Sequence, residues 1–171
     1  MNHQPVVDIK AWIDARPVSR YQWLILLLCF VVIMLDGYDA AVMGFIAPAL
    51  IEDWGISRAE LGPILGAAMF GVALGALVAG PLADRCGRKR VLLGSICLFA
   101  FFSLCGAAAQ SPMQLALLRF LTGLGLGAVM PGCVTLVAEY MPERRRGLMI
   151  TLMYSGFNVG SGLGGFIAAG L

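Results

Sequence analysis

Residues 61–90 read LGPILGAAMFGVALGALVAGPLADRCGRKR, and this stretch decides the fold class. Residues 61–83 carry no charge, whereas Asp84 and four basic residues follow within the next seven positions. At about 1.5 Å per residue, an uncharged run of this length crosses the hydrocarbon core of a bilayer as one helix. The stretch therefore predicts a membrane-spanning helix that ends in a basic loop.

Four further apolar runs of similar length lie on both sides of this stretch. Together the runs predict five helices after a polar segment at 1–20, at about 21–50, 61–83, 91–109, 113–140 and 148–171. The runs are continuous, whereas the strands of a membrane β-barrel alternate in polarity over about ten residues. The predicted fold is all-α and integral to the membrane, with five transmembrane helices.

Composition excludes several classes of function. The chain of 171 residues is 60% hydrophobic and 13% charged, against roughly a quarter charged in a soluble domain. Its net charge of +2 offers no basic surface for nucleic acid. The five cysteines lack C-x-x-C spacing and are interpreted as apolar core residues, so no metal site is predicted. No Walker sequence is present, so no ATP site is predicted.

Basic residues indicate the orientation of the helices. Ten of the 12 lysines and arginines lie in the N-terminal segment, in the loop after 61–83, or in the loop after 113–140. The positive-inside rule then predicts a multi-pass protein with a cytoplasmic N-terminus. Ile9, Trp12 and Ile13 have the spacing of a short helix on the membrane surface, although a disordered tail fits the segment equally well.

An internal repeat relates the first three predicted helices to those that follow. Gly44-x-x-x-Pro48 in the first helix matches Gly127-x-x-x-Pro131 in the fourth. Gly71-x-x-x-Gly75 in the second helix matches Gly156-x-x-x-Gly160 in the fifth. Inverted repeats with helices interrupted by glycine and proline are typical of secondary transporters, whose binding site lies at those interruptions.

Two acidic residues, Asp36 and Asp39, lie inside the first apolar run. They are spaced i, i+3 on one helix face, and a carboxylate near the bilayer centre costs about 2.5–3.5 kcal/mol on insertion scales. Two neighbouring carboxylates at low dielectric do not both ionise easily, so we expect one of them to bind a proton near neutral pH. The pair is a candidate proton-coupling site. Alternatively, Gly37 unwinds the helix and the carboxylates bond to the broken backbone.

Three further residues are candidates for substrate binding. Arg119 is an interior charge of the fourth run, and its guanidinium fork suits a substrate carboxylate or, without substrate, one of the two aspartates. The alternative is an arginine that extends to the outer membrane interface. Tyr38 could stack on an aromatic substrate and Asn158 could hydrogen-bond to it, although both residue types also serve helix packing.

Residues 80–90, GPLADRCGRKR, resemble the G-x-L-a-D-r-x-G-R-k-x signature between helices 2 and 3 of the major facilitator superfamily. Three other pieces agree in order: Arg119-x-x-x-Gly-x-Gly, the segment EYMPERRRG at 139–147, and DGYD at 36–39 followed by Gly44 and Pro48. The last piece resembles the aromatic acid:proton symporters of this superfamily. Residues 19–48 are similar to the bacterial 4-hydroxybenzoate/protocatechuate transporters in particular.

The resemblance implies a bacterial inner-membrane carrier of about twelve helices that takes up an aromatic carboxylate together with a proton. It implies no cofactor and no enzymatic activity, so no catalytic residue is assigned. By resemblance, Asp36 and Asp39 are the acids required for transport. It further implies a cytoplasmic gate loop with Gly80, Asp84, Arg85, Gly87 and Arg88, and a cytoplasmic loop between helices 4 and 5 with Glu139, Arg146 and Gly147. Asp84 would accept hydrogen bonds from the arginines and from helix N-terminal amides.

Five spans correspond to the N-terminal half of such a carrier without its sixth helix. We therefore expect an N-terminal fragment that does not transport alone, because alternating access needs two halves that move against each other. Its partners would be the missing C-terminal half, the lipid bilayer, the aromatic carboxylate and H⁺. Two alternatives stay open: a truncated membrane protein that does not transport, and a proton-coupled carrier for another substrate class.

Overall fold

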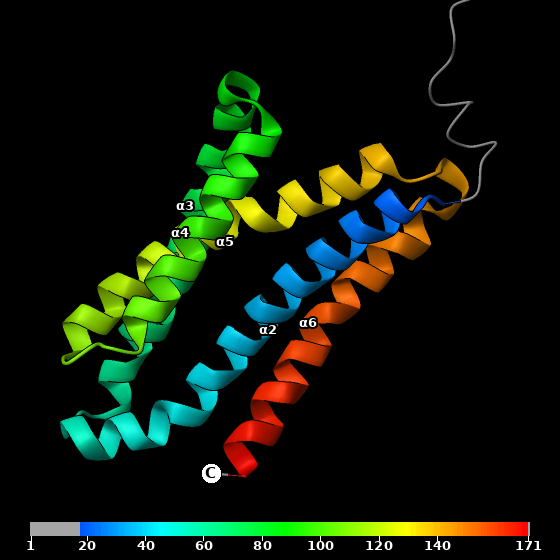
Figure 1. The fold of residues 1–171 in the computed structure, drawn as a ribbon. Helices are drawn as coiled ribbons and strands as arrows, with labels where there is room; N and C mark the ends of the chain where they lie inside the picture. The colour runs from blue at the N-terminus through cyan, green and yellow to red at the C-terminus, as the bar shows by residue number, and fades with distance from the viewer. Residues whose placement is uncertain (1–17, 171) are drawn as a thin grey trace, which may run out of the picture.

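The computed structural model describes residues 18–170, and long α-helices carry most of them (Figure 1). The helices are α2 (Arg20–Trp54), α3 (Arg58–Cys86), α4 (Arg88–Gly106), α5 (Pro112–Tyr140) and α6 (Arg146–Ala169), with a 3-10 helix η1 (Glu143–Arg145) before α6. No strand occurs in this part of the chain. The all-α prediction is confirmed, whereas the surface helix considered at residues 9–13 lies outside the described residues.

Four of these helices are long and apolar enough to cross a membrane. Mean hydropathy reaches 2.2 in α2, 2.0 in α3, 1.6 in α4 and 1.8 in α5. The α6 helix is continuous over 24 residues but is not among the four, since its glycines, serines and Asn158 dilute its apolar residues. A fifth span at α6 therefore stays a prediction.

Serine caps and two glycines set the helix ends. Ser19, Ser57 and Ser111 each accept a hydrogen bond from a backbone N–H three residues later, at the starts of α2, α3 and α5. Such caps typically contribute about 1 kcal/mol. Gly55, at a φ of 63°, ends α2, and Gly87, at a φ of 89°, is the single residue between α3 and α4. Both angles favour glycine over residues with a Cβ atom.

The predicted spans differ from the observed helices mainly at their ends. α2 and α3 extend beyond 21–50 and 61–83 into the flanking polar residues, because membrane hydropathy does not mark where helical backbone stops. α4 ends at Gly106 rather than 109, because a turn there leads to the Ser111 cap. α2 is helical throughout Arg20–Trp54, so Gly37 does not unwind it and the broken-helix alternative is wrong.

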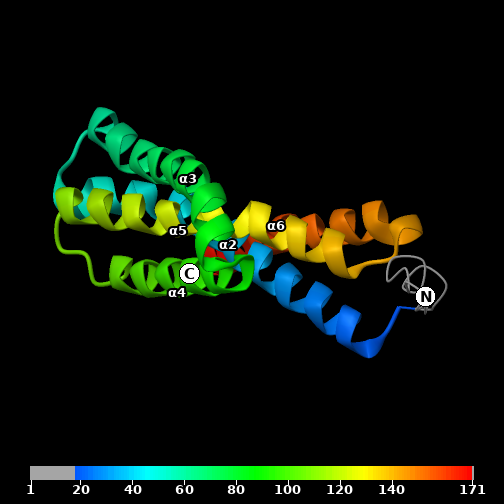
Figure 2. The ribbon, with the colours of Figure 1, turned by 90° about the horizontal axis from the view of Figure 1, so that it is seen from above.

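α5 is the central helix, and it contacts every other long helix. Figure 2 shows α3 and α4 beside the first part of α5, whereas α2 and α6 extend to the other side of the molecule. At its end, α5 meets the start of α2, where the Gln22 side chain donates to the Tyr140 carbonyl at 2.5 Å. The start of α2 and the end of α5, each next to basic residues in the sequence, are therefore in contact.

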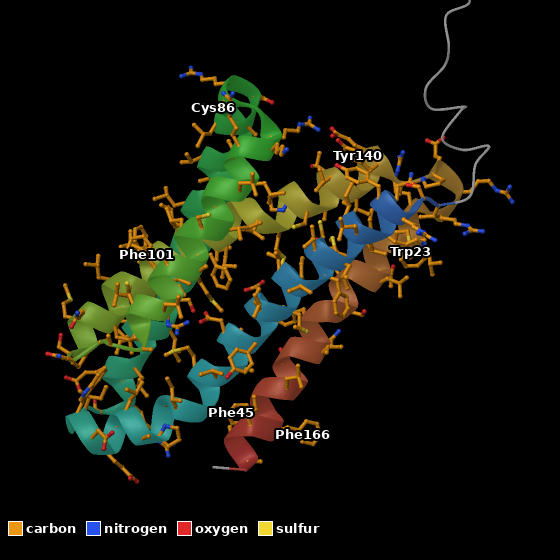
Figure 3. The ribbon with its side chains drawn as sticks, viewed as in Figure 1. Trp23, Phe45, Cys86, Phe101, Tyr140 and Phe166 are labelled. Atoms are coloured by element: carbon orange, nitrogen blue, oxygen red, sulfur yellow. The ribbon has the colours of Figure 1, made fainter. Side chains whose placement is uncertain are left out.

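Large apolar side chains cover much of the outside of this bundle. Figure 3 shows Phe101 and Phe166 projecting away from the helices, and these side chains are 61% and 82% exposed. Trp23 and Phe45 are each 50% exposed. An apolar outer surface of this kind suits contact with lipid, where the backbone polar groups are satisfied within each helix.

The internal repeat predicted from the sequence has a structural counterpart in two helix pairs, α3 with α5 and α6 with α2. At each matched position a Cβ atom on a glycine would overlap the backbone of the facing helix. In the α3–α5 pair, Gly71 meets Phe120, Gly75 meets Leu124 and Gly127 meets Val72. In the α6–α2 pair, the corresponding contacts are Gly156 with Phe30, Gly160 with Met34 and Gly37 with Phe157. Small residues thus bring both helix pairs to the same close approach.

The register of the repeat differs from the one that the sequence motif indicates. The contacts place Gly127 of α5 opposite Gly37 of α2, whereas the shared Gly-x-x-x-Pro motif equates Gly127 with Gly44. Gly44 has open space around it, so it does not take part in such a contact. The motif match is therefore wrong in register by two helical turns, and both helices run through their prolines without interruption.

Candidate functional site

Arg119 and Asp39 form an ion pair between α5 and α2. Nη1 of Arg119 donates to Oδ2 of Asp39 at 2.5 Å. The two side chains are only 10% and 14% exposed, and a charge at such a place is tolerated because a partner neutralises it. The structure therefore favours the pairing of Arg119 with an aspartate over its extension to the outer membrane interface.

Ser103 of α4 binds the other oxygen of the same carboxylate. Its Oγ donates to Oδ1 of Asp39 at 2.8 Å. Three helices thus meet at Asp39, with α2 supplying the acid, α5 the cation and α4 the hydroxyl. Sequence reasoning missed Ser103, because a single serine in a membrane helix has no distinctive pattern and usually serves packing.

A cavity of about 500 Å³ lies beside these three residues. Its wall is mostly apolar and comes from α2, α4 and α5, with Tyr38, Asp39, Ser103 and Arg119 as polar members. Ligand sites are typically apolar cavities of about 300–1,000 Å³ with a few convergent polar groups. Size and composition therefore suit a small amphipathic molecule with one anionic group.

Arg119 keeps binding capacity toward this cavity. Its second terminal nitrogen, Nη2, lies near Gly106 of α4. Within residues 18–170, this guanidinium makes one hydrogen bond, from Nη1 to the carboxylate of Asp39. A guanidinium presents five N–H donors, so donors remain for a carboxylate in the cavity.

Asp36, the second predicted acid, is buried one helical turn before Asp39. The residue is 9% exposed, and its carboxylate has no hydrogen bond or ion pair to any residue that the structure describes. It continues a buried row of α2 with Cys29 and Ile33, both packed in the apolar core around α5. The two predicted acids therefore differ, since Asp39 is paired and Asp36 is buried without a polar partner among the described residues.

The other two residues predicted to contact the substrate, Tyr38 and Asn158, also lie in different surroundings. Tyr38 lines the cavity with Arg119. Asn158 is on the exposed face of α6 and does not line this cavity. The structure thus brings Tyr38 and Arg119 together and leaves Asn158 apart from them.

A second ion pair lies at the basic end of α5. Arg88, the first residue of α4, binds Glu139 of α5. These side chains are 59% and 51% exposed, so water reaches both. The expected gate loop and the expected loop after helix 4 are therefore joined to each other.

The other predicted gate residues surround this pair. Gly80, Asp84, Arg88 and Glu139 line a cavity of about 190 Å³ between α3, α4 and α5. The expectation that Asp84 accepts hydrogen bonds from the arginines is not met within residues 18–170, because Arg88 turns to Glu139 instead. Arg85 is exposed in the last turn of α3.

Beyond α5, the chain passes through η1 into α6. Nη1 of Arg146 lies 3.8 Å from a carboxylate oxygen of Glu143, an ion pair within one turn. The carbonyl of Gly147 accepts a hydrogen bond from the Thr151 hydroxyl at 3.0 Å. These residues belong to the local structure of the α5–α6 connection and do not reach the Arg119 cavity.

Among residues 18–170, no group of histidine, cysteine or acidic side chains is arranged to hold a metal ion. The cysteines are free thiols, and Cys29 and Cys133 are buried in the core as interpreted from the sequence. Cys86 and Cys97 are exposed instead, so the core interpretation is wrong for them.

Comparison with known proteins places these features in a family. Residues 28–171 match the model described as Major Facilitator Superfamily. The chain is 60% identical over 165 residues to a gallate transporter of Pseudomonas putida, and 56% identical over 165 residues to the 4-hydroxybenzoate transporter PcaK of Pseudomonas aeruginosa. Each alignment covers 96% of this chain and 37% of the relative.

A more distant relative extends the series. The benzoate transport protein of Acinetobacter baylyi is 32% identical over 168 residues, which are 95% of this chain and 36% of that protein. The chain thus spans little more than a third of the length of these relatives.

The signature at residues 80–90 correctly indicated this relationship. The long apolar helices and the family match together make the protein a multi-pass membrane protein of a transporter family, not an enzyme. Since the family model covers most of its length, the chain belongs to the Major Facilitator Superfamily.

Proposed function

We propose that this chain is part of a secondary active transporter that takes up an aromatic carboxylate, such as 4-hydroxybenzoate or protocatechuate, together with a proton. The observation that carries the proposal is the buried Arg119–Asp39 pair in the wall of the 500 Å³ cavity. Two relatives, a gallate transporter and a 4-hydroxybenzoate transporter, support the substrate class. The location is the bacterial inner membrane, with the N-terminus in the cytoplasm.

Charge balance at Arg119 links substrate to proton. Without substrate, Asp39 neutralises the guanidinium. A substrate carboxylate that binds Arg119 takes over this role and would leave Asp39 as an uncompensated buried charge. Protonation of Asp39 removes that charge, because a neutral carboxylic acid is far less costly to bury than a carboxylate. Substrate anion and proton are therefore bound together.

The other predicted residues have supporting roles in this proposal. Asp36, buried one turn away, is a second acid that can hold a proton during transport. Tyr38 contacts the aromatic ring from the cavity wall. Asn158 lies on the exposed face of α6 and contacts the substrate when the carrier closes α6 toward the site.

The second half of the carrier is the proposed partner at the cytoplasmic end. Asp84 has no partner within residues 18–170 and lines a cavity with Arg88 and Glu139. A free carboxylate there can accept hydrogen bonds from a helix N-terminus of the other half. Gly80, Arg85 and Gly87 shape and position this gate loop, and Arg146 and Gly147 shape the neighbouring α5–α6 connection. No cofactor is required, since the proton gradient supplies the energy.

Uptake by cells that express the complete gene product tests the proposal. Labelled 4-hydroxybenzoate, protocatechuate, gallate and benzoate are each supplied with and without a protonophore. We expect accumulation of at least one hydroxylated benzoate, abolished by the protonophore. Non-aromatic carboxylates of similar charge are the matched control, because they bind Arg119 but lack the ring.

Three outcomes would contradict the proposal in different ways. Accumulation that survives the protonophore excludes proton coupling. Transport restricted to another substrate class excludes the aromatic carboxylate. Absence of any transport, with the protein present in the membrane, supports a membrane protein that does not transport.

A further inference from the structure

The carboxylate of Asp39 has two differently bound oxygens, and this asymmetry carries an inference about Ser103. Oδ2 faces the Arg119 guanidinium, and Oδ1 faces the Ser103 hydroxyl at 2.8 Å. We propose that Ser103 is a positioning residue of the proton step, which directs the proton to Oδ1 of Asp39 and sets the pH range over which Asp39 accepts it. This inference rests on the proposed proton-coupled function.

The two partners differ in what they can do after protonation. A guanidinium has donors and no acceptor, so an acid hydrogen on Oδ2 would point at another N–H. A serine hydroxyl can both donate and accept. With Asp39 ionised, Ser103 donates to Oδ1; with Asp39 protonated on Oδ1, Ser103 accepts from the new O–H. Its own hydrogen can then turn to the carbonyl four residues earlier in α4.

The position of Ser103 suits such a switch. The residue is half-buried, lines the cavity and comes from α4, not from the helices that supply the ion pair. A proton on Oδ1 therefore lies between Asp39 and Ser103, whereas Arg119 stays at Oδ2 or turns to the substrate. Nothing in this arrangement requires a further residue to move.

The charged groups around Asp39 on each packed helix complete the description. On α5 the charge near Asp39 is Arg119, and Glu139 lies at the far end of that helix. On α2 the neighbouring charge is Asp36, one turn away, whereas Arg20, Glu52 and Asp53 lie near the helix ends. The charges of α4 are Arg88, Lys89 and Arg90 at its opposite end, 13 or more residues from Ser103. The α6 helix carries its one charge, Arg146, at its start, and α3 carries charges in its first and last turns. Asp36 and Tyr38 are thus the titratable neighbours of Asp39 on its own helix, and Ser103 is the partner of Oδ1.

Removal of the hydroxyl should change the pH dependence of uptake. A hydrogen bond to a charged acceptor is stronger than one to a neutral group. Ser103→Ala therefore destabilises the ionised form of Asp39 more than the protonated form. We expect the midpoint of the uptake-against-pH curve to move upward by about half to one pH unit.

The test measures initial uptake of labelled 4-hydroxybenzoate from pH 5 to 9 in the complete gene product. It compares the unmodified protein, Ser103→Ala, Ser103→Thr and Ser95→Ala. Ser103→Thr keeps the hydroxyl and should restore the original midpoint. Ser95→Ala is the matched control, since Ser95 is a half-buried serine of the same helix, two turns away, that does not bind Asp39. A counterflow exchange assay over the same pH range follows any variant without net uptake.

The outcomes separate this inference from the proposed function. Unmodified protein whose uptake ignores a protonophore contradicts proton coupling itself. Protonophore-sensitive uptake with the same midpoint in Ser103→Ala as in the unmodified protein overturns the role of Ser103 alone. Loss of both uptake and exchange at every pH, with protein in the membrane, also overturns it, because a positioning residue changes the range of protonation and does not abolish binding. An alkaline shift in Ser103→Ala, with rescue by Ser103→Thr, supports it.

Discussion

Two ion pairs on α5 have the same chemistry and opposite surroundings. Near the start of α5, Arg119 binds Asp39 of α2, and the side chains are 10% and 14% exposed. At the end of α5, Glu139 binds Arg88 of α4, and the side chains are 59% and 51% exposed. Each pair ties α5 to one neighbouring helix, so the difference between them lies in their access to water.

That difference separates a functional charge from a surface contact. A buried ion pair contributes little net stability compared with apolar residues of the same shape, yet removing one partner is strongly destabilising. Its presence inside a membrane helix bundle therefore indicates a task other than stability. An exposed pair contributes about 0–1 kcal/mol, so water can replace it whenever the helices separate. Such a pair suits a contact that forms and breaks during transport.

The largest expected effect comes from removing the acid of the buried pair. Asp39→Leu should lower the free energy of unfolding by about 3–5 kcal/mol, because it leaves Arg119 buried without a counter-charge. Arg119→Leu should cost less, because Asp39 can take up a proton whereas arginine stays charged at any accessible pH. Thermal unfolding of the purified complete gene product in detergent measures both variants.

The double variant Asp39→Leu/Arg119→Leu is the control for this prediction. Replacing both partners by apolar residues removes the uncompensated charge, so most of the lost stability should return. Uptake should stay abolished, because neither a proton site nor a carboxylate site remains. A double variant as unstable as Asp39→Leu would mean that shape, not charge, sets the cost.

The charged positions of both pairs could be predicted from the sequence, but only part of their pairing could. Asp39 and Arg119 stand out because each is a charge within an apolar run, and their opposite signs suggest a pair. Arg88 and Glu139 were expected in neighbouring cytoplasmic loops, and nothing in a sequence of many basic residues indicates which arginine binds the glutamate. Ser103 gives no signal at all, since its role depends on how α4 and α2 are placed around α5, which brings its hydroxyl to Asp39.

The fold follows the same rule, since local features are predictable and registers are not. Long apolar runs identify the helices, and the matched Gly71-x-x-x-Gly75 and Gly156-x-x-x-Gly160 both lie at close helix contacts in the structure. The repeat, however, is set by which backbones meet. Gly37 therefore matches Gly127, although the proline motif points to Gly44. Residue types determine what a helix face can approach, whereas only packing determines where along the partner it does so.

A smaller effect should distinguish the two arginines by their geometry. Arg119→Lys keeps the charge but loses the planar fork, so the apparent affinity for 4-hydroxybenzoate should fall by about tenfold, or about 1.4 kcal/mol. The matched variant Arg88→Lys should leave affinity unchanged, because Arg88 does not line the cavity beside Arg119. Concentration-dependent initial uptake measures both. Undiminished affinity in Arg119→Lys would contradict carboxylate recognition by the fork.

The smallest effect is expected at the exposed pair. A double-mutant cycle of Arg88→Ala and Glu139→Ala should give a coupling energy of less than about 1 kcal/mol in thermal unfolding. That coupling should fall further between about 0.01 M and 1 M salt, over which the Debye length shrinks from about 30 to 3 Å. The cycle of Asp39→Leu and Arg119→Leu is the control, because salt does not reach a buried pair.

A large coupling between Arg88 and Glu139 that salt does not weaken would remove the contrast between the two pairs. The exposure of 59% and 51% belongs to residues 18–170 by themselves, and the proposed second half of the carrier would approach this same end. If that half covers the pair in one conformation, the coupling energy should depend on which conformation is populated. Substrate added during the measurement would then change the salt dependence of the coupling between Arg88 and Glu139. If the pair is exposed in every conformation, substrate would leave that salt dependence unchanged. The salt experiment therefore tests whether this contact opens and closes with transport.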